Sequence, residues 1–235
     1  MTEPLLLLPG LACDARVFFH QIVSLSLSRA VMVLPLKGAI VEEMSQAVLA
    51  QAPPRFALCG TGLGGTVALD VIRRAPERVT RVVLISTDPF SETPQAAAAR
   101  EARIVAARAG RVREAMTSEL PAAALFNGAA RAEVQEVVGD MARVLGADAF
   151  ISQSRAMQRR PDHQKTLRRF LLPALMIAGA ADMLVPPRRQ EFTSELMPKG
   201  RFMLVNDAGH LPTMESPEAV SEAVDAFLDE PLMLR

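Results

Sequence analysis

The sequence predicts an α/β protein with a mainly parallel sheet flanked by helices. Short apolar runs alternate with helical stretches, which is typical of strand–helix–strand units. The runs LLLL and RVVLIS are apolar without alternation, as expected for strands that are buried on both faces. The length of 235 residues and the hydrophobic content of 50% are sufficient for a buried core. We therefore expect a single domain over residues 1–235 that carries one insertion.

Six segments are predicted to form the strands of this sheet. They are residues 4–9, 30–36, 55–60, 81–87, 174–180 and 201–207. The last helix is expected to begin with Ser216 as the N-cap and Pro217 as the first helical residue, since proline is favoured at that position.

Residues 91–165, between the fourth and fifth strands, contain no strand-like run. Apolar residues recur there at helical spacing, so we expect three or four helices inserted as a lid. A helical face packed flat on the sheet is the alternative. The arginines of this segment are expected to form mostly a solvated face: Arg100, Arg103, Arg108, Arg111 and Arg113.

Charge and composition argue against several classes of binding partner and of bound group. The chain has 26 basic and 26 acidic residues, which gives no reason to expect nucleic acid or an acidic membrane surface. Its two cysteines, Cys13 and Cys59, make neither a disulfide framework nor a metal site. The start, MTEPLLLLPG, lacks the features of a signal peptide, and no segment approaches the ~18 apolar residues that span a bilayer. The sequence predicts a cytoplasmic protein without metal or cofactor, and leaves its oligomeric state open.

The segment GTGLGG, residues 60–65, fits two motifs. It matches the G-x-G-x-x-G turn of dinucleotide-binding proteins, and Asp88, 23 residues after Gly65, is near the spacing of a ribose contact. That motif usually belongs to the first strand–helix turn of its unit, whereas two predicted strands precede it here. The segment also matches G-x-S-x-G, the nucleophile elbow of hydrolases, except that Gly62 stands in the serine position.

The elbow interpretation requires an acid and then a histidine at the ends of later strands. Asp182 follows the fifth predicted strand and His210 follows the sixth. The carboxyl ends of parallel strands share one edge of the sheet, so Gly62, Asp182 and His210 are expected to converge. Asp88 is the alternative partner for His210. The first loop supplies an oxyanion donor, the Leu11 N–H, with Gly10 allowing close approach.

The chain resembles the compact bacterial α/β-hydrolases. The segments that carry the resemblance are LLPGLxCDARVF, GxxLGGxVALDVIRRAPERVxRVVLIST, GAADMLVPP and AGHLPTMESPEAV, and it runs from about Leu5 to Leu228. Within that family it resembles small esterase- and lyase-type members with four lid helices. The resemblance implies the α/β-hydrolase fold, a site at the strand ends and a nucleophile–acid–histidine triad.

Gly62 departs from the family pattern, because glycine has no side chain that could attack a carbonyl. The parent chemistry is hydrolysis of a carboxylic ester or similar acyl bond of a small, largely apolar substrate. In it, a serine at position 62 attacks, His210 acts as base and then acid, Asp182 orients His210, and the Leu11 and Leu63 N–H groups bind the oxyanion.

Two other functions remain open from the sequence. One is a His210–Asp182 dyad enzyme without a nucleophile, such as a lyase, a cyclase or a cofactor-free oxygenase. The other is a member that has lost catalysis and binds a ligand. Among substitute nucleophiles, a water activated by His210 is favoured over Thr61 and Cys13.

Overall fold

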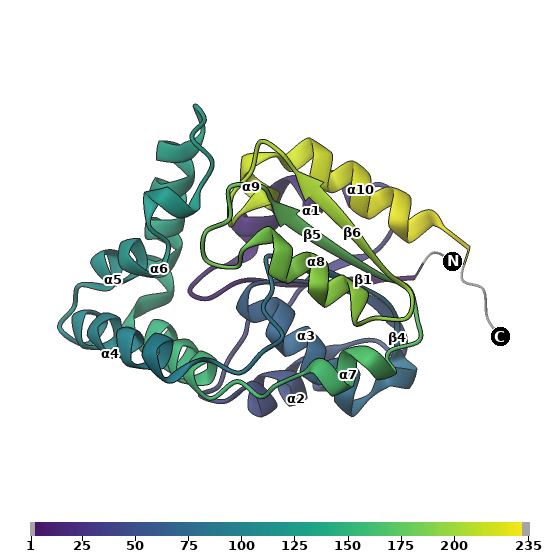
Figure 1. The fold of residues 1–235 in the computed structure, drawn as a ribbon, viewed down its shortest axis with the longest axis horizontal. Coiled ribbons are helices and arrows are strands. Elements are labelled where there is room, and N and C mark those ends of the chain that lie inside the picture. Colours follow the sequence, from purple (N-terminus) through teal and green to yellow (C-terminus); the bar gives the residue numbers. More distant parts are fainter. Residues whose placement is uncertain (1–2, 232–235) are drawn as a thin grey trace.

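The computed structural model describes residues 3–231 and contains a six-stranded sheet whose paired strands are all parallel (Figure 1). The strands pair in the order β2-β1-β3-β4-β5-β6. The prediction of a mainly parallel α/β sheet is confirmed, and all six predicted strands are present. Their bounds are β1 Leu5–Leu8, β2 Val31–Val33, β3 Phe56–Thr61, β4 Val79–Ile85, β5 Ala174–Gly179 and β6 Gly200–Val205.

The central strands form the core of the molecule. Every residue of β1, β3, β4 and β5 is buried, as their continuous apolar sequences predict. The edge strands β2 and β6 are mostly half-buried or exposed. Burial of a leucine side chain contributes roughly 1.5–3 kcal/mol, so the four buried leucines of β1 anchor the sheet.

Helices cover both faces of the sheet. On one face α1 packs against α10, and on the other α3 packs against α2 and α7 (Figure 1). Helix α8 packs against β5 and β6. Outside the segment between β4 and β5, the helices are α1 Phe19–Leu25, α2 Val41–Gln51, α3 Leu63–Arg74, α8 Pro187–Glu195, α9 Pro212–Glu215 and α10 Pro217–Asp229. Short 3-10 turns cover Ala15–Phe18, Pro76–Arg78 and Ala122–Ala124.

Three helices between β4 and β5 form a separate layer, here called the helical insertion. They are α4 Pro94–Arg108, α5 Val112–Glu119 and α6 Arg131–Gln158, and they lie beyond the carboxyl ends of the strands (Figure 1). Gly146, at φ 85° and ψ 172°, divides α6 into two helical pieces. The following helix, α7 Gln164–Arg169, packs on α3 instead. The helices thus fall within the segment expected from the sequence.

Ser216 precedes α10, and Pro217 is the first residue of that helix, as predicted. The Ser216 side chain makes no capping hydrogen bond; its hydroxyl donates to the carbonyl of Asp207 at 2.9 Å. Within residues 3–231, no helix has the length and hydropathy needed to cross a bilayer.

Candidate active site

Gly62 lies in the sharp turn between β3 and α3. Its backbone has φ 52° and ψ −114°, a conformation that residues with a side chain rarely adopt. The Gly62 N–H donates to the carbonyl of Ile85 at 3.0 Å, which fixes the turn against the end of β4. The geometry is therefore that of the sharp strand-to-helix turn which the elbow interpretation requires.

The neighbouring glycines serve close packing. A Cβ on Gly64 would overlap the carbonyl oxygen of Leu8, so glycine lets α3 begin directly against β1. A Cβ on Gly65 would likewise overlap the Thr87 hydroxyl oxygen after β4. Gly65, the last glycine of the dinucleotide motif, and Gly64, the last glycine of the elbow motif, thus have a structural role that involves no phosphate.

His210 and Asp182 form a hydrogen-bonded pair. The Nδ1 atom of His210 lies 3.0 Å from both carboxylate oxygens of Asp182. Asp182 Oδ1 also accepts from the backbone N–H groups of Leu184 and Val185, at 2.9 and 3.0 Å. Gln190 of α8 donates from Nε2 to Asp182 Oδ2 at 3.0 Å. This set of bonds fixes the carboxylate, and the carboxylate fixes the imidazole ring with Nε2 directed away from it.

The Nε2 atom of His210 faces Gly62. An ideal Cβ built on Gly62 lies 4.0 Å from that nitrogen, and no other atom outside the adjoining residues comes within 4 Å. The space between them accommodates one oxygen atom, either of a side chain at position 62 or of a bound molecule.

Opposing effects act on the pKa of His210. Burial lowers it, but the negative charge of Asp182 and its hydrogen bond to Nδ1 raise it, with further contributions from Glu119 and Glu215. The pKa is raised overall, above the ordinary value for histidine. A base with a raised pKa has a stronger affinity for the proton that a nucleophile would release.

The loop after β1 lies beside the same space. The N–H of Cys13 donates to the carbonyl of Gly10 at 3.2 Å, and Ala12 has φ 52°, so residues 10–13 form a tight turn. Gln153 of α6 holds this turn, because its Oε1 accepts from the Ala12 N–H at 2.6 Å. Gly10 and Leu11 line the cavity beside Gly62.

Leu63 is the first residue of α3, so its N–H has no intrahelical acceptor. It lines the same cavity as Leu11, Gly62 and His210. Of the six residues that the sequence analysis assigned to the site, five line this cavity: Gly10, Leu11, Gly62, Leu63 and His210. The sixth, Asp182, is joined to the cavity through its hydrogen bond with His210.

Several other candidates take different roles. Asp88 does not pair with His210; its Oδ2 atom lies 2.9 Å from Arg189 and 3.5 Å from Arg160, and its Oδ1 accepts from the Phe90 N–H. Burial raises the pKa of the Cys13 thiol to about 12, so the thiolate needed for attack is scarce at neutral pH. His163 is buried beside α7, away from the cavity.

Glu215 of α9 supports the His210 loop and was not identified from the sequence. Its Oε2 accepts from the N–H groups of Gly209 and Leu211, at 3.0 and 2.9 Å, on either side of His210. Its Oε1 accepts from the Phe126 N–H of the helical insertion at 2.6 Å. The signal available in the sequence was a glutamate five positions after the histidine, just before the predicted last helix, which begins at Pro217.

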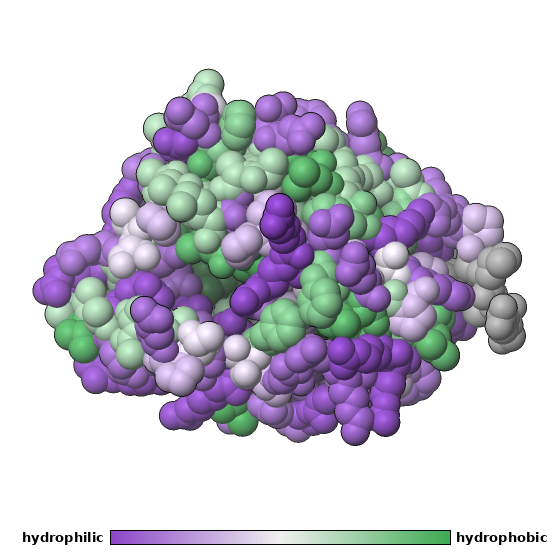
Figure 2. Space-filling view, viewed as in Figure 1, coloured by the Kyte–Doolittle hydropathy of each residue, from purple (hydrophilic) through white to green (hydrophobic). Residues whose placement is uncertain are grey.

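A cavity of about 430 Å³ joins these elements. A recess partly lined by apolar residues opens between the helical insertion and the rest of the molecule (Figure 2). Apolar side chains such as Met116, Met157 and Val185 contribute to the lining. Charged side chains line the rest. The larger part of the lining surface is apolar, which is compatible with the largely apolar substrate expected from the sequence.

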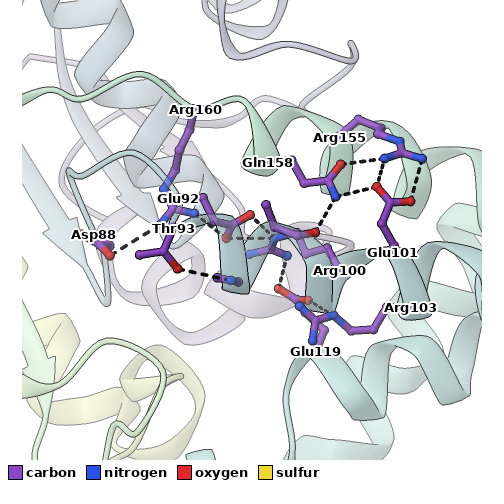
Figure 3. Close-up of polar contacts among 12 residues, drawn as sticks. Asp88, Glu92, Thr93, Arg100, Glu101, Arg103, Glu119, Arg155, Gln158 and Arg160 are labelled. Atoms are coloured by element: carbon purple, nitrogen blue, oxygen red, sulfur yellow. Dashed lines mark hydrogen bonds and ion pairs between the residues drawn. The ribbon is translucent and has the colours of Figure 1, made fainter.

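The charged part of the wall is a continuous chain of ion pairs, here called the arginine–carboxylate chain; Figure 3 shows its course from Asp88 to Arg103. Its members alternate in sign, each is within 3.5 Å of the next, and all line the cavity: Arg189, Asp88, Arg160, Glu92, Arg100, Glu119 and Arg103. Arg100 is only 7% exposed, so the expectation that the insertion arginines are mostly solvated is wrong for this residue. Burial of this arginine is tolerated because carboxylates pair with it.

Within residues 3–231, no three His, Cys, Asp or Glu side chains are grouped so that they could hold a metal ion. The ionisable side chains that line the cavity include His210 and the arginine–carboxylate chain.

Comparison with known proteins agrees with this arrangement of strands and helices. The family model for the alpha/beta hydrolase fold matches residues 38–217, and the chain belongs to that family. A pimeloyl-[acyl-carrier protein] methyl ester esterase of Aromatoleum aromaticum is 32% identical over 199 residues, which cover 78% of each chain. The protein of the same name from Edwardsiella ictaluri is 28% identical, covering 80% of this chain and 74% of the relative.

Solved structures show the same fold. A thermophilic esterase from Thermogutta terrifontis superposes with a TM-score of 0.83 at 26% identity, over 96% of this chain and 89% of the esterase. An enol-lactonase from Burkholderia xenovorans superposes with a TM-score of 0.88 at 22% identity, over 98% of this chain and 92% of that one.

Proposed function

We propose that this chain has the site of a carboxylic ester hydrolase from which the nucleophile is missing. The observation that carries the proposal is the position of Gly62, in a strained turn, with a Cβ that would lie 4.0 Å from His210 Nε2. A serine there would place its hydroxyl between Cβ and the base. The Nδ1 bond from His210 to Asp182 would orient the ring and stabilise the imidazolium.

The remaining steps follow from the same geometry. The serine Oγ attacks the ester carbonyl while His210 Nε2 takes its proton, and the Leu11 and Leu63 N–H groups bind the oxyanion. His210 then returns the proton to the departing alcohol, and a water repeats the sequence to release the acid. With Gly62 the chain lacks the attacking atom, so no acyl-enzyme forms, although the groups that would serve the later steps remain.

The names of the similar proteins suggest the substrate class, an ester at the end of an acyl chain. A cavity of about 430 Å³ is within the usual range for small-molecule sites, roughly 300–1,000 Å³. We assign residues 91–165 the role of a lid on a single domain of residues 1–235, because α4 and α5 supply one wall of the cavity and the strand ends supply the other.

The direct test is the Gly62→Ser variant, assayed on short-chain nitrophenyl esters. We expect ester hydrolysis well above that of the parent chain. The matched control is Gly62→Ala, which adds the same Cβ without the hydroxyl and is expected to stay inactive. A second control, Gly62→Ser with His210→Ala, separates triad chemistry from a serine that reacts by itself. If Gly62→Ser hydrolyses no ester, the assignment is wrong.

The open space beside His210 Nε2 favours one second candidate, base catalysis without a covalent intermediate. In that function His210 abstracts a proton from a substrate or from a water at this place. Turnover of a substrate by the Gly62 chain, abolished by His210→Ala, would support it over the hydrolase. Binding of esters without any turnover by the parent chain is the result expected from our main proposal.

A further inference from the structure

The arginine–carboxylate chain has more arginines than carboxylates. It begins and ends with arginine, so four positive side chains flank three negative ones. Each carboxylate lies between two arginines: Asp88 between Arg189 and Arg160, for example. One positive charge is therefore in excess in the wall of the cavity.

The excess charge resides at the two ends. Among the carboxylates of residues 3–231, Arg160 and Arg100 each contact two, whereas Arg189 contacts only Asp88 and Arg103 contacts only Glu119. A terminal arginine has guanidinium nitrogens left to bind a ligand, because one carboxylate does not use all five donors.

The two ends differ in their surroundings. The Arg189 side chain is 50% exposed, and its guanidinium lies over the Phe90 ring at 5.3 Å from the centroid. Water screens such a group. The Arg103 side chain is 19% exposed and lines the cavity. The Nε atom of Arg103 lies 2.7 Å from Glu119 Oε2. That nitrogen is buried, and its contact with Glu119 does not have the geometry of a hydrogen bond. Arg103 is thus the less satisfied and less solvated of the two.

The Arg103 end is also close to the reacting centre. Glu119, which contacts Arg103, is near enough to His210 for its charge to act on the imidazole. A molecule that extends from the Gly62–His210 space along the wall of α4 and α5 reaches Arg103 within the same cavity.

We propose that Arg103 binds a carboxylate carried by the substrate, so that the preferred ligand is an ester whose acyl chain ends in a single negative charge. This inference rests on the proposed hydrolase function for the ester end of the ligand. A single excess charge matches a carboxylate monoanion, and the planar guanidinium suits the two carboxylate oxygens.

Binding to the unmodified chain tests the proposal without any catalysis, because Gly62 leaves the ester uncleaved. The probes are monomethyl adipate and dimethyl adipate, which differ by one methyl group and one charge. Titration calorimetry is expected to give a Kd about tenfold or more lower for the monoanion, as a charge-assisted hydrogen bond in a partly buried site provides. Equal Kd values for the two probes would overturn the proposal.

Variants then locate the charge. Arg103→Gln is expected to reduce the preference for the monoanion to below about twofold and to leave the Kd of the diester unchanged. Arg103→Lys keeps the charge and is expected to keep part of the preference, which covers the case in which the glutamine variant does not fold. Arg111→Gln, a substitution at an exposed arginine between α4 and α5, is the matched control, and Arg189→Gln tests the other end of the chain.

The outcomes separate the two proposals. A preference that survives Arg103→Gln, or that only Arg189→Gln removes, refutes the assignment to Arg103. Such a result leaves the hydrolase function untouched if Gly62→Ser still cleaves neutral nitrophenyl esters. Conversely, if Gly62→Ser is inactive while the monoanion binds through Arg103, the proposed chemistry fails and the anion site stands.

Discussion

A Cβ at Gly62 would lie 4.0 Å from Nε2 of His210, with no other non-adjacent atom equally close. The relationship joins the turn after β3 to the loop after β6, two places that are 148 residues apart in the chain. In the proposed function His210 is the base and Asp182 orients it, whereas position 62, on which they would act, carries only a hydrogen atom.

The backbone conformation of Gly62 leads us to expect that any side chain introduced at this position lowers the stability of the fold. Residues other than glycine lose about 1–3 kcal/mol in such a conformation. We expect Gly62→Ala and Gly62→Ser each to lower the free energy of unfolding by about this amount, measured by denaturant titration. Gly10→Ala is the control, because Gly10 has no positive φ and a Cβ there meets its nearest atom at 3.6 Å. Equal losses at both positions would refute the strain argument.

The pKa of His210 depends on Asp182. The Asp182 charge and its hydrogen bond raise it, and burial lowers it. In Asp182→Asn only the burial effect and the weaker acidic neighbours remain, so we expect that pKa to fall. NMR titration of the imidazole in the Gly62 chain measures this without activity. Asp88→Asn is the control and is expected to leave the His210 pKa nearly unchanged; a larger effect of that variant would make Asp88 the partner.

The same interaction predicts a pH dependence of stability. The pKa of His210 is raised in the folded chain, so protonation stabilises the fold. That contribution is full at pH values below the pKa of an unfolded histidine and is lost as the pH rises through the higher folded pKa. We expect His210→Gln to cost more unfolding free energy at pH 5.5 than at pH 9. A loss that is independent of pH would show that the imidazolium–Asp182 interaction does not stabilise the fold.

The contacts of Glu215 lead us to expect that the stability of the His210 loop depends on the segment around Phe126. Its carboxylate accepts from three backbone N–H groups, of Phe126, Gly209 and Leu211. Glutamine at this position offers one acceptor and turns an NH₂ group toward donors, so we expect Glu215→Gln to lower the unfolding free energy by about 1–3 kcal/mol. Glu222→Gln on the exposed face of α10 is the control. Faster amide exchange of Phe126, Gly209 and Leu211 would localise the effect.

The sequence predicts the sheet and the contact between Asp182 and His210 for the same reason. Continuous apolar runs mark buried strands, and parallel strands bring the residues after them to one edge. Both inferences need only local patterns and a topological rule, so neither depends on knowing which side chains meet.

The supporting residues could not be predicted in that way. Gln153 binds the Ala12 N–H across 141 positions, and no local pattern indicates such a contact. Arg100 was expected in solvent because arginines are mostly exposed. It is buried because Glu92 and Glu119 lie beside it, 8 and 19 positions away, once α4 and α5 have packed together.

The missing side chain at position 62 has a consequence for crystallography. Within the proposed function, an ester that enters the cavity meets the oxyanion donors and the base but no attacking atom, so it persists in its ground-state geometry. Soaked crystals of the unmodified chain would show the intact bond, the face of the carbonyl that points toward position 62 and the path of the acyl chain. An enzyme with an active serine would cleave the bound ester before the complex could be observed.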